Sequence, residues 1–376
     1  MNTFFYPLQK LNGFERAKEC LDTGKTCQVT GCADSQLAHF ITGLSDGYKN
    51  KVIVTFSGTK AKELYEDLKA FDKNVVLYPA KDFIFFSADV HGNVILQQRL
   101  ECIKKLVEDK PCTIVTTADG LMDKIMPLDR IKENVLEISE GSIIEMDAIR
   151  HKLVQMGYEG AEQVESPGQF AIRGSIIDIY TLTDEVPYRI DMWDDEVDII
   201  KSFEVETQRS IENLEKITIY PATDYVLTKE EIRAGIDKIK KDLKKNSEAL
   251  RKQFKTEEAH RLEVIIKEFI DNEEINENGM SFDSYVNYFY DGMVSFIDYL
   301  KDAAFFIDEP KRVDEQMKAV ETEFRDSMSN RLEKGYVLPG QTDIVWSRKT
   351  IESKLDSVKK VLFTSLDQTV KNFTVD

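Results

Sequence analysis

Long apolar runs are missing from this sequence of 376 residues. Runs such as residues 83–86 stop at four residues, whereas a membrane-spanning helix needs roughly 18 apolar residues or more. The first ten residues lack the basic start, apolar stretch and small-residue cleavage site of a signal peptide. We therefore expect a soluble, cytoplasmic protein with no membrane contact.

Cysteine and histidine are also scarce. The five cysteines form no CxxC pair, and the four histidines are far apart with no partner at metal-ligand spacing. An odd number of cysteines without such spacing is typical of reduced thiols in a cytosolic protein. The sequence thus predicts neither a disulfide framework nor a metal site.

Positive charge is in deficit, since 50 Lys and Arg face 68 Asp and Glu for a net charge of −18. A protein that grips nucleic acid over a wide surface needs a Lys/Arg excess, so the balance disfavours this class. A local basic patch remains compatible with it. Thr228 and Glu231 form a capping-box pattern before a long charged helix predicted towards Phe269, whose Lys and Glu runs we interpret as a solvated face.

The order of apolar segments predicts an α/β fold. Up to residue 133, near-continuous apolar strands such as 51–56 and 112–116 alternate with helical patterns, which is typical of a parallel sheet. Residues 134–220 read as a compact α+β domain rich in strands, and residues 221–350 return to helices with apolar strands at 303–307 and 342–346. Residues 351–376 form a C-terminal segment with a last strand at 361–364.

A phosphate-binding loop is missing where the topology calls for one. The turn after the strand at 28–30 opens a helix, which is the arrangement that such a loop requires. Its candidate positions are Gly31, Ala33, Asp34 and Ser35, and Asp34 stands where a lysine would contact the phosphates. A carboxylate there repels phosphate, so this loop is degenerate and we expect no ATP hydrolysis at it.

A second feature similar to part of a nucleotide-binding site is the pair Asp308 and Glu309, which follows an apolar strand. It is similar to the acidic pair that holds magnesium in helicase-type ATPases, although acidic residues at strand ends are common. Together with the degenerate loop, the pair favours a motor fold without its nucleotide site, and we assign no catalytic residue.

The most specific text lies in the middle domain, where residues 168–180 read GQFAIRGSIIDIY and residues 187–198 read PYRIDMWDDEVD. These segments resemble the UvrB family of nucleotide excision repair, and more closely the Mfd family of bacterial transcription-repair coupling factors. The resemblance covers essentially the whole chain and is strongest between Gly168 and Ala222.

The resemblance implies a degenerate helicase-like (RecA/P-loop type) α/β domain, split around an inserted α+β domain that binds UvrA. In this family, RNA polymerase and DNA are engaged by further C-terminal domains, which also use ATP and magnesium as an ATP-dependent DNA translocase. For the present chain it implies no cofactor and a non-catalytic role in transcription-coupled nucleotide excision repair. We also hypothesise that the C-terminal domains mask the UvrA-binding surface in the full-length protein. UvrB has a DNA-clamping hairpin, for which residues 79–98 are too short.

The strand at 188–193 carries the predicted binding site. Its side chains alternate, so Tyr188, Ile190 and Met192 share the core face while Arg189, Asp191 and Trp193 share the other. An outward aromatic near an arginine suits a binding hot spot. The competing interpretation is that a helix covers Trp193 and that Arg189 pairs with Asp191.

The resemblance favours the binding interpretation, because Arg173, Arg189 and Trp193 fall on the family's UvrA-contacting positions. Two alternative functions remain open at this point. One is a residual nucleotide-binding domain, and the other is a DNA-binding helicase-like domain.

Overall fold

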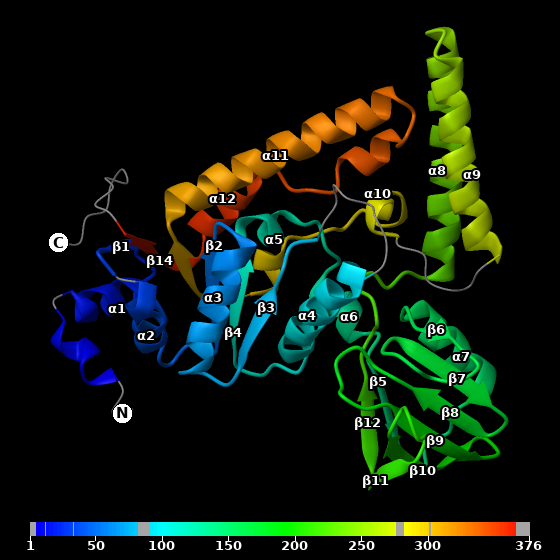
Figure 1. Cartoon of the computed structure of the whole chain (residues 1–376), viewed down its shortest axis with the longest axis horizontal. Coiled ribbons are helices and arrows are strands. Elements are labelled where there is room, and N and C mark those ends of the chain that lie inside the picture. Colours follow the sequence, from blue (N-terminus) through cyan, green and yellow to red (C-terminus); the bar gives the residue numbers. More distant parts are fainter. Residues whose placement is uncertain are drawn as a thin grey trace. The chain divides into compact units, whose positions relative to one another are not determined.

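The computed structural model describes residues 5–11, 13–32, 34–81, 90–275, 282–300 and 302–365. The chain divides into two compact units (Figure 1). Unit 1 comprises Met1–Lys124, Val294–Asp326 and Val345–Asp376, whereas unit 2 comprises Ile125–Met293 and Ser327–Ile344. Each unit therefore combines segments that are far apart in the sequence.

Unit 1 contains a six-stranded sheet in which every pairing is parallel. In spatial order its strands are β1 (Cys27–Thr30), β14 (Lys359–Thr364), β13 (Ala304–Asp308), β2 (Asn50–Thr55), β4 (Cys112–Thr117) and β3 (Val75–Tyr78). The central strands are nearly continuous in buried apolar residues, as expected of parallel strands that are covered on both faces. The predicted α/β class is confirmed.

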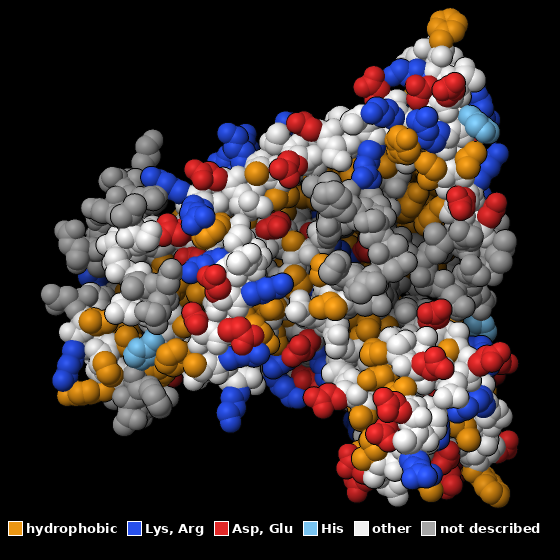
Figure 2. Space-filling view, viewed as in Figure 1, with side chains coloured by type: hydrophobic (Ala, Val, Ile, Leu, Met, Phe, Trp, Pro, Cys, Tyr) orange, Lys and Arg blue, Asp and Glu red, His pale blue; other side chains and the backbone are white. Residues whose placement is uncertain are grey.

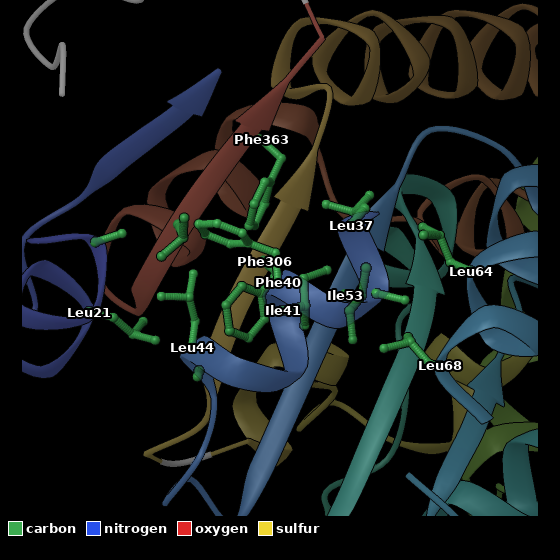
Figure 3. Packing of buried hydrophobic residues seen from close by; sticks show 14 of the residues in the cluster. Leu21, Leu37, Phe40, Ile41, Leu44, Ile53, Leu64, Leu68, Phe306 and Phe363 are labelled. Carbon is green, nitrogen blue, oxygen red and sulfur yellow. The ribbon is translucent and has the colours of Figure 1, made fainter. Parts of the chain in front are cut away.

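Helices of unit 1 connect these strands. They are α1 (Phe14–Asp22), α2 (Asp34–Leu44), α3 (Gly58–Lys69), α4 (Val90–Val107), α5 (Ala118–Met122), α12 (Arg348–Asp356) and the 3-10 turns η2 (Leu8–Lys10) and η4 (Phe296–Tyr299). Helix α11 (Pro310–Glu333) is divided between the two units after Asp326. Helices α1 to α3 supply one wall of the main core (Figure 3). There Ile53 and Phe306 of the sheet pack with helix residues such as Ile41 and Leu64.

A polar network is buried beside the edge strand β3. The fully buried Arg99 of α4 donates through Nη1 to Asp123 Oδ2 at 2.6 Å and through Nη2 to the Tyr78 hydroxyl at 2.6 Å. The Tyr78 ring in turn stacks on Phe296, with 3.6 Å between ring centroids. Burial raises the pKa of Asp123 to about 6, although Arg99 opposes the shift.

Unit 2 contains a second, largely antiparallel sheet. Its spatial order is β11 (Ser210–Leu214), β10 (Glu196–Phe203), β9 (Tyr188–Trp193), β8 (Ile176–Ile179), β7 (Gln169–Arg173) and β6 (Glu159–Gly160), with a parallel pairing between β6 and β7. A separate pair joins β5 (Leu136–Ser139) to β12 (Lys216–Ile219). The remaining elements of unit 2 are α6 (Leu128–Lys132), α7 (Met146–Gln155), α8 (Lys229–Lys252), α9 (Thr256–Ile275), η3 (Phe282–Ser284), α10 (Val286–Phe289) and η5 (Pro339–Thr342).

Two expectations about the later part of the chain are wrong. The long helix predicted from Thr228 is a pair of helices, α8 and α9, because Phe254 adopts a left-handed φ of 62° and turns the chain. The capping box of Thr228 and Glu231 does form at the start of α8. The strand expected at 342–346 is replaced by η5 and by a single antiparallel bridge between Val345 and Asp123.

The five cysteines, all within the described ranges, are not joined in disulfides, and burial raises the pKa of Cys27 to about 12. Within the parts of the chain that the structure describes, no helix has the length and apolar character that crossing a membrane requires.

The pKa of Asp123 predicts how stability depends on pH. Because the folded-state pKa of about 6 exceeds the value of about 3.9 in an unfolded chain, the folded protein holds this proton more tightly. This contribution to the free energy of unfolding is full below about pH 4 and is lost as the pH rises through about 6. Relative to Asp123→Asn, we expect the free energy of unfolding to fall by about 2 kcal/mol from about pH 4.5 to pH 7.5.

Urea denaturation in a Trp193→Phe background, followed by the fluorescence of Trp346, measures this difference in unit 1, since the chain has two tryptophans. A difference between the two proteins that stays constant over this pH range contradicts the assignment.

Candidate partner-binding site

The face of β9 predicted to bind a partner is exposed at the Trp193 end, whereas Asp178 and Phe203 of the same sheet face are buried. Ile190 and Met192 are buried on the opposite face, as the alternation predicts. Trp193 ends the strand with 77% of its surface exposed. No helix covers it in the described part of the chain, so the interpretation that buried this side chain is wrong.

Two arginines of this face meet at one carboxylate. Asp178 on β8 is fully buried and lies directly opposite Arg189 of β9 in the strand register. Arg189 binds it with two parallel bonds, Nε to Oδ1 at 2.7 Å and Nη2 to Oδ2 at 2.8 Å. Arg173 at the end of β7 adds a third bond from Nη2 to Oδ2 at 2.7 Å. Three charge-assisted hydrogen bonds thus fix β7, β8 and β9 to each other.

Arg189 has further partners in the loop between β10 and β11. Its Nη2 also donates to Gln208 Oε1 at 2.9 Å, and its Nη1 donates to the Gln208 carbonyl at 3.3 Å. Its guanidinium lies over the Phe203 ring, 4.4 Å from the centroid. Hydrogen bonding to Asp178 raises the pKa of Arg189. With its side chain only 15% exposed, Arg189 is a structural residue as well as a candidate contact.

Arg173 has more freedom. Its side chain is 43% exposed, and its ion pair with Asp178 involves a single nitrogen. A guanidinium has five N–H donors in a planar fork, so most of its edge can meet a carboxylate from a partner. Arg173 thus combines an anchored orientation with an accessible charge.

The local pairing expected between Arg189 and Asp191 does not form. Asp191 instead accepts a hydrogen bond from Lys201 Nζ on β10 at 2.6 Å. Lys201 also lies opposite Arg189 in the register. The exposed face is therefore lined by alternating charges, with Trp193 at one end.

The acidic turn after Trp193 is exposed. Asp194, which has a left-handed φ of 58°, and Asp195 link β9 to β10, and Glu196 pairs with Trp193. All three side chains face solvent. Ile143, which is 67% exposed, forms a bridge to Glu196. Their register places Ile143, Glu196 and Trp193 in one row, because directly paired residues of a sheet share a face.

The structure thus brings together the three predicted contact residues on one sheet face and adds residues that the sequence reasoning missed. These are Asp178, Gln208, Phe203 and Ile143. A signal for Asp178 existed, because a lone carboxylate inside the apolar run Ile176–Ile179 requires a buried cation. Nothing in the sequence indicated that Gln208 bonds Arg189, since this contact depends on the conformation of the loop between β10 and β11.

The segment predicted to be a degenerate phosphate loop lies between a strand and a helix, as expected. Strand β1 ends at Thr30, Gly31 adopts a left-handed φ of 74°, and α2 begins at Asp34. Ala33 lies outside the described residues, and so do the side chains of Asp34 and Ser35.

The acidic pair at the end of β13 is held by neighbouring groups. Asp308 Oδ2 accepts from the Thr55 hydroxyl at 2.8 Å, and Glu309 Oε1 accepts from the Ser365 amide at 2.6 Å. Across the described ranges, no group of three or more His, Cys, Asp or Glu side chains has metal-binding geometry.

Part of unit 2 is similar to a known family of domains. Residues 136–225 match the family model described as the UvrB interaction domain. This range contains β7 to β11 and thus the whole face described above.

Most of the chain is similar to a particular group of proteins. An alignment of 314 residues with the transcription-repair-coupling factor of Bacillus subtilis (strain 168) is 31% identical. This alignment covers 82% of this chain and 26% of the relative. A Staphylococcus epidermidis protein of the same name is 30% identical over 83% of the chain and 27% of its own length. One from Staphylococcus haemolyticus is 30% identical over 91% of the chain and 29% of its own length. The predicted resemblance to transcription-repair coupling factors is confirmed, and the chain spans about a quarter of the length of these relatives.

The shared carboxylate predicts different costs for removing its two arginines. Arg189→Met leaves the buried Asp178 with a single ion-pair partner, and we expect unit 2 to lose about 3 kcal/mol of stability. Arg173→Met removes one bond from a half-exposed side chain, and we expect a loss of about 1 kcal/mol or less.

Hydrogen exchange of β8 and β9 amides, measured by mass spectrometry, reports the loss of stability in unit 2 separately from any change in unit 1. Lys201→Met, which removes a neighbouring cation that bonds Asp191 and not Asp178, is the matched control. Equal exchange rates in the two arginine variants contradict the assignment.

Proposed function

We propose that unit 2 binds UvrA through the exposed face of its sheet, as part of transcription-coupled nucleotide excision repair. The single observation that carries the proposal is the exposed Trp193, which lies on the same face as Arg173 and Arg189 within the UvrB interaction domain. Large aromatic and arginine side chains dominate the binding energy of many protein interfaces.

The arrangement supports distinct roles for the three residues. Trp193 acts as the apolar anchor, since it offers a large ring surface that solvent now covers. Arg173 acts as the accessible cation that recognises a carboxylate of UvrA. Arg189 acts mainly as a positioning residue, because Asp178 and Gln208 already occupy most of its donors.

A calorimetric titration of cognate UvrA into this chain tests the proposal. Trp193→Ala removes the anchor, and we expect it to cost about 2 kcal/mol or more, which is roughly a thirtyfold loss in affinity. Trp193→Phe keeps an aromatic ring, and we expect it to retain most of the affinity.

Ile211→Ala is the matched control, because Ile211 is also an exposed apolar residue of this sheet, on β11. Binding that is equally tight in the wild type and in Trp193→Ala rules out this site. The absence of any binding by the folded wild type rules out the partner.

We further propose that this chain is not an enzyme. Asp34 occupies the position of the phosphate-binding lysine, and the carboxylates of Asp308 and Glu309 already hold Thr55 and Ser365. Engagement of RNA polymerase, translocation along duplex DNA and the use of ATP then belong to other parts of a full-length coupling factor. In equilibrium dialysis with magnesium and ATP at about 1 mM, a typical upper range for substrate affinities, we expect no retention of nucleotide; saturable retention contradicts this proposal.

A further inference from the structure

A lysine-rich face runs along α8 in an otherwise acidic chain. Between Lys238 and Lys255 the sequence contains seven lysines and one arginine against two acidic residues, whereas the whole chain has a net charge of −18. Figure 2 shows Lys and Arg side chains gathered along the α8–α9 hairpin, with acidic side chains among them. Positive charge is thus concentrated on one element.

Helical geometry places these lysines on the solvent side of α8. The buried residues Ile236, Ile239 and Leu243 mark the inner face of the helix. At 100° per residue, the opposite side carries a set of exposed lysines. These are Lys238, Lys241, Lys244, Lys245 and Lys252, and they span about 21 Å of helix. Asp237 and Glu248 also lie on this side.

In the described parts of the chain, Lys241, Lys244, Lys245 and Lys252 form no ion pair within 4.0 Å. Glu263 pairs with Arg251 at 2.7 Å and Glu333 pairs with Lys255 at 3.1 Å, whereas Asp237 and Glu248 lie on the same side of α8 as the lysines. Five lysines against these two carboxylates leave the face with a net positive charge for an anionic partner.

An exposed aromatic residue stands at the tip of the same hairpin. Phe254 is 94% exposed and holds a φ of 62°, a conformation that bulky side chains rarely adopt. Backbone of this kind costs about 1 kcal/mol or more, and an exposed phenyl ring gains nothing from folding. Such a combination is expected where the ring has a binding role.

We propose that the lysine face of α8 and the ring of Phe254 bind single-stranded nucleic acid. Lysines along the helix neutralise successive phosphates, while the ring stacks on an unpaired base, which is the usual combination in single-strand binding. The composition favours nucleic acid over a protein partner, because lysine is depleted and arginine enriched in protein interfaces. A duplex lacks exposed base faces for the ring, which favours single strands.

The anisotropy of a fluorescein-labelled oligothymidine of about 20 nucleotides, a length that exceeds typical single-strand sites, reports binding directly. At about 50 mM salt we expect a dissociation constant on the order of 10 µM, with an affinity that falls as salt rises at a logarithmic slope of about −2 to −4. An intact duplex of the same length is expected to bind more weakly.

Two sets of substitutions test the lysine face. The triple variant Lys241→Gln, Lys245→Gln, Lys252→Gln removes charge with little change in helix propensity, and we expect it to lose at least about tenfold in affinity. The matched variant Lys62→Gln, Lys73→Gln, Lys318→Gln removes the same charge from other exposed positions and is expected to bind like the wild type. Equal affinities in the two triple variants overturn the proposal.

Phe254→Ala tests the ring, and we expect a loss of about fivefold or more that Phe254→Trp does not show. Trp193→Ala is expected to bind the oligonucleotide normally, so failure of this proposal and failure of the UvrA site are separate results. Absence of binding by the wild type at low salt overturns the proposal, as does equal binding of duplex. Full competition by polyglutamate at equal charge indicates a generic anion site and also overturns it.

Discussion

The carboxylate of Asp178 is the group on which the candidate binding face depends. It is fully buried in the middle of an antiparallel sheet, where an isolated charge is strongly disfavoured. Two guanidinium groups from the strands on either side compensate it. Neutralising this one charge therefore dictates that Arg173 and Arg189 converge, and it sets their orientation on the surface.

This arrangement separates the stability of the sheet from its capacity to bind. Arg189 lies deep in the network and extends it to Gln208 and Phe203, so its removal disturbs three strands and a loop. Trp193, at the end of β9, has no comparable internal role, because its side chain is mostly exposed. A loss of binding on changing Trp193 reports on the interface itself, whereas the same loss on changing Arg189 combines the interface with the fold.

The sequence predicts much of this fold because apolar strands and their alternation are local properties. The parallel strands of unit 1 and the two faces of β9 follow from the order of apolar residues alone. The break between α8 and α9 could not be predicted, since residues 253–255 include neither glycine nor proline and the turn depends on an unusual φ at Phe254. The convergence of two arginines on Asp178 could not be predicted either. It depends on the register of β7, β8 and β9, which is a tertiary property.

The net charge of the chain says less about its possible partners than the distribution of that charge along the sequence does. An overall value of −18 disfavours a broad nucleic-acid surface, yet it does not describe α8, where lysines occupy the side opposite the buried one. The net negative charge opposes the approach of a polyanion in general, whereas the lysines of α8 favour it locally. At physiological ionic strength the Debye length is about 8 Å, so a helix face about 21 Å long keeps a field of its own sign. An acidic protein with a lysine-rich helix is therefore suited to orient an anionic partner, and the excess of acidic residues contributes to that orientation.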